Sequence, residues 1–356
     1  MIKFLELPAE FKKTNDGDRF LLYDSYEDES YNLDCGRILV FGTRENLRVL
    51  EKTDIWYLDG TFKVVPTIFF QLFTILGSVT QHYKGTDRKI ALPLVYALLE
   101  SKAEKAYSKV IEETLLSAEE WGIRANQPSS VMTDLEMGII NAVKQHLPPE
   151  SIRLCLFHLC QSVYRKIQTE GLQEQYGDKD DTSLREASKS MCALAFVPPE
   201  DVVDVFDTLY NELPEEFLPV ANYFEVNYIR GVRAIGRRKA VAVRYAPASW
   251  NHYSSVLQGT ARTNNASEGW HNRFQLLVGK RHPSLYSFLK ELKKEQADVE
   301  YIRRELRLGK RVKNLPKNSL QRVEDRIRAI VNDYQAFKDE ENELEYLNSL
   351  GFNLHL

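Results

Sequence analysis

Short apolar runs alternate with amphipathic segments over the first 170 residues, a pattern typical of an α/β fold. The runs that predict strands lie at 20–24, 38–42, 55–59, 69–77, 89–99, 130–134 and 152–158. Pro93 marks an edge or a bulge in the fifth of them. Apolar residues at helical spacing predict helices at 45–52, 102–121, 137–146 and 159–169. Two of the strands end in an acid, and right-handed βα connections bring such strand ends to one edge of a sheet, where α/β proteins place their sites.

The strand pattern stops after about residue 172. From Ser183 to Tyr228 the sequence predicts helices separated by prolines. Further helical segments are expected at 264–278, 283–308 and 319–350. The pattern alone therefore predicts an α/β core followed by a mostly helical region.

The distribution of charge along the chain is more informative about possible partners than the net charge. The 356 residues carry 47 Lys and Arg against 51 Asp and Glu, and this net charge of −4 by itself argues against a nucleic-acid partner. Residues 1–34, however, hold nine acids against four bases, whereas 230–244 and 280–313 each carry a net charge of +6. The two basic blocks flank Glu268 and favour a surface that follows phosphate groups, although a solvated helix face is the alternative.

Cysteine content and hydropathy indicate the cellular compartment of the protein. Four scattered cysteines favour a reducing environment rather than a disulfide scaffold. The N-terminal segment has acids inside its apolar stretch, unlike a secretory signal, and the longest apolar run, Ile68 to Val79, is far shorter than the ~20 residues that span a bilayer. We therefore expect a cytosolic or nuclear protein with no membrane partner.

Three acidic residues stand out by their positions. Asp59 ends the strand I-W-Y-L-D, Asp134 ends the strand S-V-M-T-D, and Glu268 lies at the start of a helix. Carboxylates are preferred ligands of Mg²⁺ and Mn²⁺, and two such ions about 3.5–4 Å apart assist phosphodiester cleavage and transfer. The same positions also suit a turn Asp, an N-cap Asp and a Glu that interacts favourably with a helix dipole. The residues alone leave both interpretations open.

Four blocks of sequence together resemble the transposase domain of Mutator-like elements (MULE), a DDE transposase family with an RNase H-like fold. They are Y-L-D-G-T-F at 57–62, V-M-T-D-L-E-M-G-I-I-N-A-V at 131–143, C-L-F-H-L at 155–159 and N-N-A-S-E-G-W-H-N-R-F at 264–274. Each block alone is weak, but their order and spacing form a strong signal over roughly residues 50–300.

The resemblance implies a fold, a site and an activity. The fold would be an RNase H-like mixed sheet flanked by helices and interrupted by an all-helical insertion domain. Asp59, Asp134 and Glu268 would be the catalytic triad and would bind two divalent cations, Mg²⁺ or Mn²⁺. The activity would be metal-dependent DNA strand cleavage and strand transfer at transposon ends. The partners would be double-stranded DNA, as transposon ends and target, and further copies of the chain in a dimer or higher assembly. The expected location is then the nucleus.

A division of the chain into five parts follows. We expect an acidic segment with short strands at 1–50, the first part of the core at 51–171, the helical insertion at 172–262, the last part of the core at 263–300, and C-terminal helices at 301–356. Mutator-like proteins commonly carry an N-terminal zinc-binding DNA-recognition module. The residues before Asp59 lack metal-ligand spacing, so we expect no such module here.

Further residues are candidates for DNA contacts or for places near the site. Cys155 and His158 match the family's C-x2-H pair, for which a buried Cys and a packed His are the alternative. Trp270 could stack on an unpaired base, but its apolar helical position favours core packing. His271 lies on the same helix face as Glu268 and could meet DNA or water there. The basic candidates are Arg237, Arg238, Lys239, Arg273, Lys280 and Arg281.

Two alternatives to an active transposase stay open at this point. A transposase-derived DNA-binding or regulatory protein without catalytic activity would bind DNA without nicking it. A simple RNase H-like nuclease would cleave DNA without transferring strands.

Overall fold

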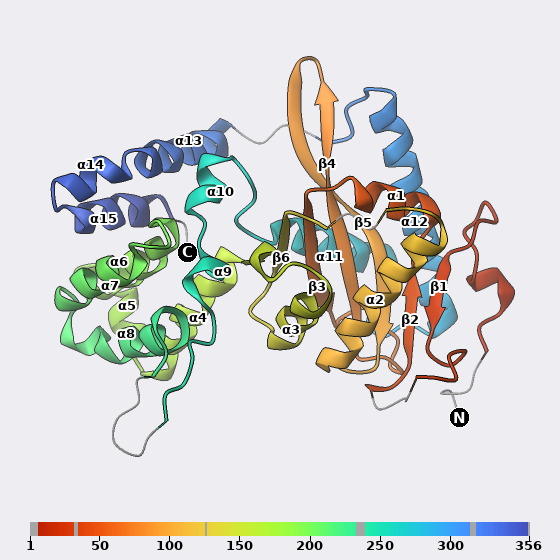
Figure 1. Cartoon of the computed structure of the whole chain (residues 1–356), viewed down its shortest axis with the longest axis horizontal. Coiled ribbons are helices and arrows are strands. Elements are labelled where there is room, and N and C mark those ends of the chain that lie inside the picture. The colour runs from red at the N-terminus through yellow and green to blue at the C-terminus, as the bar shows by residue number, and fades with distance from the viewer. Residues whose placement is uncertain (1–5, 32–34, 125–126, 233–238, 314–317, 355–356) are drawn as a thin grey trace. The chain divides into compact units, whose positions relative to one another are not determined.

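The computed structural model describes residues 6–31, 35–124, 127–232, 239–313 and 318–354 (Figure 1). The chain divides into two compact units, and each unit contains two separate segments. The first unit comprises Met1–Ile152 and Asn264–Leu315, and the second comprises Arg153–Thr263 and Pro316–Leu356. Within the described ranges, no helix is long and apolar enough to cross a membrane.

A seven-stranded mixed sheet forms the centre of the first unit, with the strand order β1-β2-β5-β4-β3-β6-β7. Near its middle, β3 pairs with β4 in antiparallel and with β6 in parallel orientation. The α/β class with a mixed sheet flanked by helices, expected from the sequence, is therefore confirmed. The strands are β1 (Leu21–Asp24), β2 (Ile38–Phe41), β3 (Ile55–Thr61), β4 (Gln71–Tyr83), β5 (Thr86–Leu99), β6 (Ser130–Thr133) and β7 (Ile152–Leu154).

Helices cover both faces of this sheet (Figure 1). Consecutive residues of a strand point to opposite faces. Phe73 packs against Tyr107 of α2, with ring centroids 5.0 Å apart, whereas the neighbouring Thr74 faces His271 of α11. Helices α2 and α11 therefore lie on opposite faces. The helices of this unit are α1 (Arg44–Glu51), α2 (Glu104–Glu120), α3 (Met137–His146), α11 (Asn265–Val278) and α12 (Leu285–Arg307).

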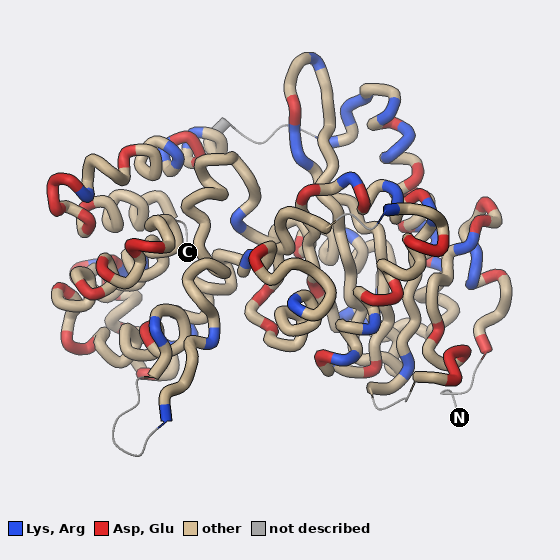
Figure 2. Tube along the Cα trace, in the orientation of Figure 1, with Lys and Arg blue, Asp and Glu red and all other residues tan. Residues whose placement is uncertain are grey.

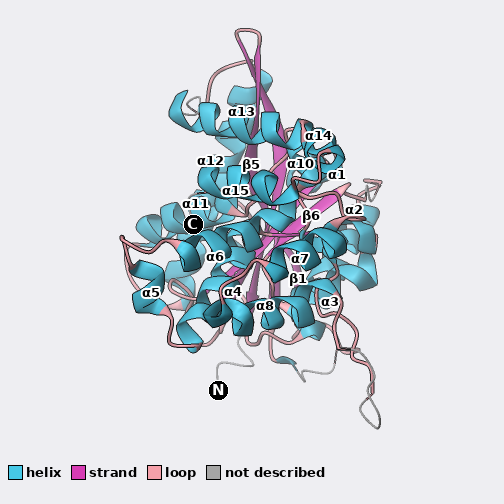
Figure 3. Cartoon of the chain, turned by 90° about the vertical axis from the view of Figure 1, so that its left-hand side faces the viewer, coloured by secondary structure: helices cyan, strands magenta, loops and turns pink. Residues whose placement is uncertain are grey.

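Strands β4 and β5 are longer than the apolar runs that predicted them. Their outer halves form a hairpin that extends beyond the rest of the sheet, as Figures 1 and 3 show. Lys84 (φ 48°) and Gly85 (φ 73°) form its two-residue turn, in which both residues adopt the left-handed conformation that a tight hairpin favours. The register between the strands shifts where Leu76 pairs with Pro93, which is the bulge expected at this proline.

Two elements differ from the prediction. The strand expected at 152–158 ends at Leu154, because Cys155 is already the N-cap of a helix. The helix expected at 319–350 is interrupted twice, and Glu341 adopts a left-handed conformation (φ 53°) between its last two parts. The resulting helices are α13 (Asn318–Asn332), α14 (Tyr334–Asp339) and α15 (Glu343–Asn353).

The second unit consists of helices and starts earlier than the insertion predicted at 172–262. Its core centres on the fully buried Trp250, whose indole nitrogen donates hydrogen bonds to the carbonyls of Tyr228 and Tyr245, both at 3.1 Å. The hydroxyl of Tyr346 in α15 donates to the carbonyl of Phe196, so the C-terminal helices pack within this unit. Its other helices are α4 (Leu156–Thr169), α5 (Gln173–Gly177), α6 (Ser183–Ala193), α7 (Val202–Asn211), α8 (Leu218–Phe224), α9 (Pro247–Trp250) and α10 (Tyr253–Leu257). Short 3₁₀ turns lie at Ala9–Phe11, Pro149–Ser151, Leu194–Phe196 and Glu215–Phe217, and a π-helical turn lies at Glu225–Ile229.

Candidate active site

Asp59 lies inside the sheet near the end of β3. The strand is apolar and buried because it has neighbours on both sides, and Asp59 keeps only 9% of its surface exposed. Its carboxylate Oδ1 accepts a hydrogen bond from the backbone N–H of Gly60 at 2.9 Å. A carboxyl group at this depth has lost most of its hydration, so its charge depends strongly on its neighbours.

Asp134 follows the neighbouring parallel strand directly. Tyr57 pairs with Met132, so Asp59 and Asp134, each two residues further along, reach the same edge of the sheet. The carboxylate Oδ1 of Asp134 accepts a hydrogen bond from the backbone N–H of Glu136 at 3.0 Å, which shapes the turn into α3. The strand-end positions predicted from the sequence therefore bring the two aspartates to one edge.

Asn264 attaches the start of α11 to β3. Its side-chain amide donates to the carbonyl oxygen of Leu58 at 3.3 Å, and its Oδ1 accepts from the hydroxyl of Ser267 at 2.6 Å. Asn264 itself is fully buried. Because Leu58 precedes Asp59, this attachment carries the first turn of α11, and with it Glu268, to the region of the two aspartates.

The electrostatics of Asp59 show that the acids share one neighbourhood. Burial raises the pKa of the Asp59 carboxyl to about 8, and the negative charges of Asp134, Glu268 and Glu136 act in the same direction. The hydrogen bond from Gly60 opposes this shift only in part. Even so, within the part of the chain that the structure describes, no three His, Cys, Asp or Glu side chains gather closely enough to hold a metal ion.

Glu136 is an acid of this neighbourhood that the sequence reasoning did not single out. Its carboxylate accepts a hydrogen bond from the hydroxyl of Tyr107 at 2.6 Å and lies 3.4 Å from the ammonium group of Lys102. Burial, followed by the bond to Glu136, raises the pKa of Tyr107. The only signal in the sequence was its place two residues after Asp134, which equally suits an ordinary acid before a helix.

His271 lies beside Asp59 and one turn after Glu268. Its Nδ1 is 3.5 Å from Oδ2 of Asp59, and its Nε2 is 3.5 Å from the hydroxyl of Thr74. Burial lowers the pKa of His271 to about 4, so the imidazole is neutral at neutral pH. Because burial also favours the uncharged form of Asp59, the pair is a contact between polar groups rather than an ion pair.

The comparison with known families concerns this same part of the sheet. The family model of the MULE transposase domain matches residues 55–162. Residues 55–162 are similar to this domain, and we call them the MULE stretch. The match covers under a third of the chain, includes Asp59 and Asp134, and ends before Glu268. Searches of curated proteins and of solved structures found no match.

The MULE stretch also contains Cys155, which precedes α4 of the second unit, and His158, which lies in that helix. Cys155 is buried at the N-cap, and His158, partly buried in the first turn, packs edge-on against Phe157 with ring centroids 5.5 Å apart. The Nδ1 atom of His158 is buried without a hydrogen-bond partner. All four cysteines of the chain are buried, and none forms a disulfide.

Trp270 and Arg273, two other candidates after the MULE stretch, make contacts inside the first unit. The indole of Trp270 is 6% exposed, stacks on Phe274 and donates to Oε1 of the buried Glu295 at 2.8 Å. The guanidinium of Arg273 forms an ion pair with the same Glu295. These contacts place Trp270 in the packing between α11 and α12, whereas the half-exposed Arg273 is linked to α12 by its ion pair.

The basic candidates differ in how far the structure describes them. Lys280 and Arg281 are exposed just after α11, and Lys239 is exposed in the second unit, whereas Arg237 and Arg238 lie outside the described residues.

A further basic group appears where the β4–β5 hairpin meets the segment after α12. Gln81 accepts hydrogen bonds from the backbone N–H groups of Val312 and Lys313 at 2.8 and 3.0 Å, and donates to the carbonyl of Lys313 at 3.2 Å. Burial and the nearby Arg311 lower the pKa of Arg88, and burial and Arg88 lower that of Lys313, so these cations are crowded together. Figure 2 shows Lys and Arg on both segments. We call this group, Arg88, Arg311 and Lys313, the hairpin cluster.

Proposed function

We propose that this protein is a DDE-type DNA transposase that catalyses metal-dependent DNA strand cleavage and strand transfer at transposon ends. The observation that supports the proposal is that the charges of Asp134 and Glu268 both act on the buried Asp59 carboxyl, in a unit that contains most of the MULE stretch. Their charges act together on the Asp59 carboxyl and raise its pKa. A buried concentration of negative charge is costly unless a cation offsets it, which is the usual situation of a catalytic metal site.

Two divalent cations, Mg²⁺ or Mn²⁺, suit this set of ligands in kind, because all three are carboxylates. The side chains themselves are not gathered around one point among the described residues, so ion binding would have to accompany a movement of these side chains. Asp59, Asp134 and Glu268 would hold the ions, which when bound would activate the attacking oxygen and stabilise the leaving oxygen.

The protein's own residues would prepare the site in three ways. Asn264 fixes the helix that carries Glu268 to the strand that carries Asp59. His271, neutral and buried, lies against the Asp59 carboxyl as a polar neighbour. The hairpin cluster offers positive charge to a DNA backbone, because phosphate contacts are largely made by Lys and Arg.

The proposal includes the setting in which this chemistry would take place. The substrate would be double-stranded DNA, as element ends and target, the location the nucleus, and the active form a dimer or higher assembly that holds two ends together. The crowded cations of the hairpin cluster support a DNA partner despite the net charge of −4.

The alternative function is a transposase-derived DNA-binding or regulatory protein without catalysis. The observation that favours it is the absence of a gathered metal-binding group in the described part of the chain. It predicts DNA binding that is unchanged when the acids are neutralised.

The deciding experiment compares Asp59→Asn, Asp134→Asn and Glu268→Gln with the parent protein. Nicking of supercoiled plasmid is measured in Mg²⁺ and in Mn²⁺, with chelated samples as blanks. Transfer of a labelled duplex with a free 3′-hydroxyl into the plasmid is measured separately, because it distinguishes a transposase from a nuclease. We expect each substitution to reduce both activities at least about 100-fold.

Asp54→Asn is the matched control, because Asp54 is an exposed carboxylate just before the other end of β3. It should act like the parent protein. If all three acid variants retain full activity, the assignment of the triad is wrong. If the parent binds DNA but shows neither activity, the non-catalytic alternative stands.

A further inference from the structure

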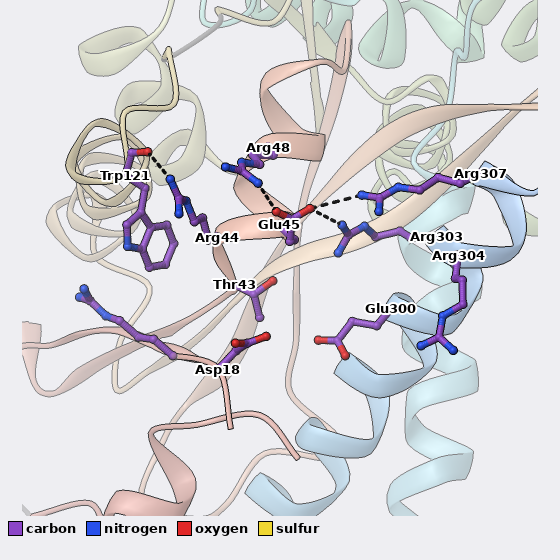
Figure 4. A pocket seen from close by; sticks show the side chains of 11 residues that line it. Asp18, Thr43, Arg44, Glu45, Arg48, Trp121, Glu300, Arg303, Arg304 and Arg307 are labelled. Atoms are coloured by element: carbon purple, nitrogen blue, oxygen red, sulfur yellow. Dashed lines mark hydrogen bonds and ion pairs between the residues drawn. The ribbon is translucent and has the colours of Figure 1, made fainter. Parts of the chain in front are cut away.

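A pocket rich in arginine lies in the first unit, on elements that carry none of the three acids. Its volume is about 580 Å³, and it is lined by the first turn of α1, the end of α12, Trp121 after α2, and the segment before β1 (Figure 4). Six arginines line it: Arg19, Arg44, Arg48, Arg303, Arg304 and Arg307. Only three acids, Asp18, Glu45 and Glu300, do so as well, which leaves an excess of positive charge.

The carboxylate of Glu45 contacts three of these six arginines. Oε2 of Glu45 lies 3.1 Å from Nη2 of Arg303 and 3.3 Å from Nη2 of Arg307, while Oε1 of the same group pairs with Arg48. Figure 4 shows the three guanidinium groups around this side chain. A single negative charge cannot offset three positive ones, so the group retains a net charge of about +2.

The other side of the pocket is fixed around Trp121. Arg44 donates to the carbonyl oxygen of Trp121 at 3.3 Å. Arg19 lies over the indole ring, 5.4 Å from its centroid, and donates to Glu120 at 2.9 Å. These contacts hold two cations in defined positions, which lowers the entropic cost of binding a charged ligand.

Arg303 adds a buried guanidinium, whose hydrogen-bonding capacity is only partly satisfied, to the wall of the pocket. Its side chain is only 8% exposed, and its Nε–H is buried without a hydrogen-bond partner. A buried donor of this kind costs free energy unless a further acceptor satisfies it. Burial and the adjacent Arg307 lower its pKa, which is the electrostatic effect of crowded positive charge.

The start of α1 adds backbone donors to the same place. Thr43 is the N-cap, and its hydroxyl accepts from the N–H of Asn46, so the first turn is well formed. The earlier N–H groups of the helix, at Arg44 and Glu45, have no partner within the helix, and the helix dipole is positive at this end. Helix starts with this combination bind phosphate groups.

We propose that this pocket binds a small ligand that carries two or more phosphate groups. A volume of about 580 Å³ is that of a small-molecule site, within the usual ~300–1,000 Å³, and too small for duplex DNA to enter. Several phosphates would place acceptors between the Glu45-centred arginines and the start of α1 at once. Nucleoside triphosphates and inositol polyphosphates share this chemistry. The site does not depend on the transposase activity proposed above.

Binding is measured by calorimetry on the full chain, without divalent ions, so that the result does not depend on any metal site. The probes are ATP, inorganic triphosphate and inositol hexakisphosphate, with orthophosphate and a short duplex DNA for comparison. We expect at least one polyphosphate to bind, more tightly than orthophosphate, and to lose affinity as salt is raised. Preference for ATP over triphosphate would identify a nucleotide, and preference for inositol hexakisphosphate would identify the other source; both results support the proposal.

The test variant is Arg304→Gln with Arg307→Gln, since both side chains are exposed and their loss should leave the fold intact. It should bind the polyphosphate at least about tenfold more weakly, because charge-assisted hydrogen bonds are lost. The control, Lys290→Gln with Lys294→Gln, removes the same charge from α12 outside the pocket and should change affinity less than about twofold. Three outcomes would overturn the proposal: no polyphosphate binds at millimolar concentration, both variants lose affinity equally, or duplex DNA alone binds through Arg304 and Arg307.

Discussion

The imidazole of His271 lies 3.5 Å from the carboxyl group of Asp59, and burial drives both groups toward their neutral forms. A strand residue and a helix residue more than 200 positions apart thus meet at the sheet edge where the acids converge. We expect three results at this site, one at the hairpin cluster and one in the second unit.

Replacing Asp59 by Asn should stabilise the metal-free protein. Its folded pKa of about 8 exceeds the unfolded value of 3.8, so the parent loses stability as pH rises from about 4 to about 8. The Asn variant has no ionisable group at this position, so its unfolding free energy does not fall for this reason. Urea unfolding in EDTA should show equal stability near pH 4 and an advantage of at least about 2 kcal/mol for the variant at pH 8. A parent and variant that stay equal across this range would contradict the burial of charge at Asp59.

Divalent ions should stabilise the parent protein and not its acid variants. An ion that binds only the folded state adds about 2.7 kcal/mol at 100 times its dissociation constant. Thermal unfolding with and without Mg²⁺ or Mn²⁺ should therefore show a rise in Tm for the parent and for Asp54→Asn. Asp59→Asn, Asp134→Asn and Glu268→Gln should show little or none. An equal rise in all five proteins would point to ions bound elsewhere.

Asn264→Ala should loosen the helix that carries Glu268. It removes the donor to the Leu58 carbonyl and the acceptor for Ser267, both buried. We expect a loss of about 1–3 kcal/mol in unfolding free energy. DNA cleavage should fall more than the folded fraction does, because Glu268 would lose its position. If the activity per folded molecule is unchanged, Asn264 has a purely structural role.

Arg88→Gln with Arg311→Gln should weaken DNA binding through the hairpin cluster. Loss of two phosphate contacts should reduce the magnitude of the slope of log K against log salt concentration by about 2. Affinity should fall by the same factor for every DNA sequence. The matched control, Lys52→Gln with Lys105→Gln, removes two exposed cations elsewhere in the first unit. Titrations of labelled duplex at several salt concentrations distinguish the two variants. A salt dependence that both leave unchanged would exclude the cluster from the interface.

Acid should destabilise the protein through His252. Its ring is fully buried, its Nε2 lies 3.0 Å from the carbonyl oxygen of Leu154, and burial lowers its pKa to about 3. Because the unfolded chain binds a proton at about pH 6.5, unfolding free energy should fall by up to about 1.4 kcal/mol for each pH unit below that value. His252→Gln should flatten this dependence, whereas His82→Gln, at an exposed site, should not. Equal slopes in all three proteins would show that other groups cause the acid sensitivity.

The elements around Asp59 and Asp134 could be predicted because local patterns determine them. An apolar strand that ends in Asp is visible in the sequence, and the parallel pairing of β3 with β6 agrees with a crossover connection that contains helix α2. The attachment of α11 through Asn264 was not visible, because it depends on a tertiary hydrogen bond to Leu58. The sequence therefore predicted the identity of the site residues, but not the tertiary contacts that position them.

The arginine pocket could not be predicted from the sequence at all. Arg19, Arg44 and Arg303 come from three distant segments, and each alone resembles an ordinary surface charge. The fold brings them together, so no local pattern could have indicated the site. The early end of β7 had a local cause instead, since Cys155 already serves as a helix N-cap while its apolar neighbours favoured a longer strand.

The discontinuity of the first unit affects how the protein matures. Asp59 and Asp134 precede the first segment of the second unit in the chain, whereas Asn264 and Glu268 follow that segment. During translation, Asp59 and Asp134 are therefore synthesised more than a hundred residues before Glu268. The segment between them must fold back before α11 can pack on the sheet. Truncated products that stop before Asn264 would contain all seven strands of the sheet without the complete acid set. Competence to cut DNA, if the proposed activity holds, would thus be acquired only late in translation.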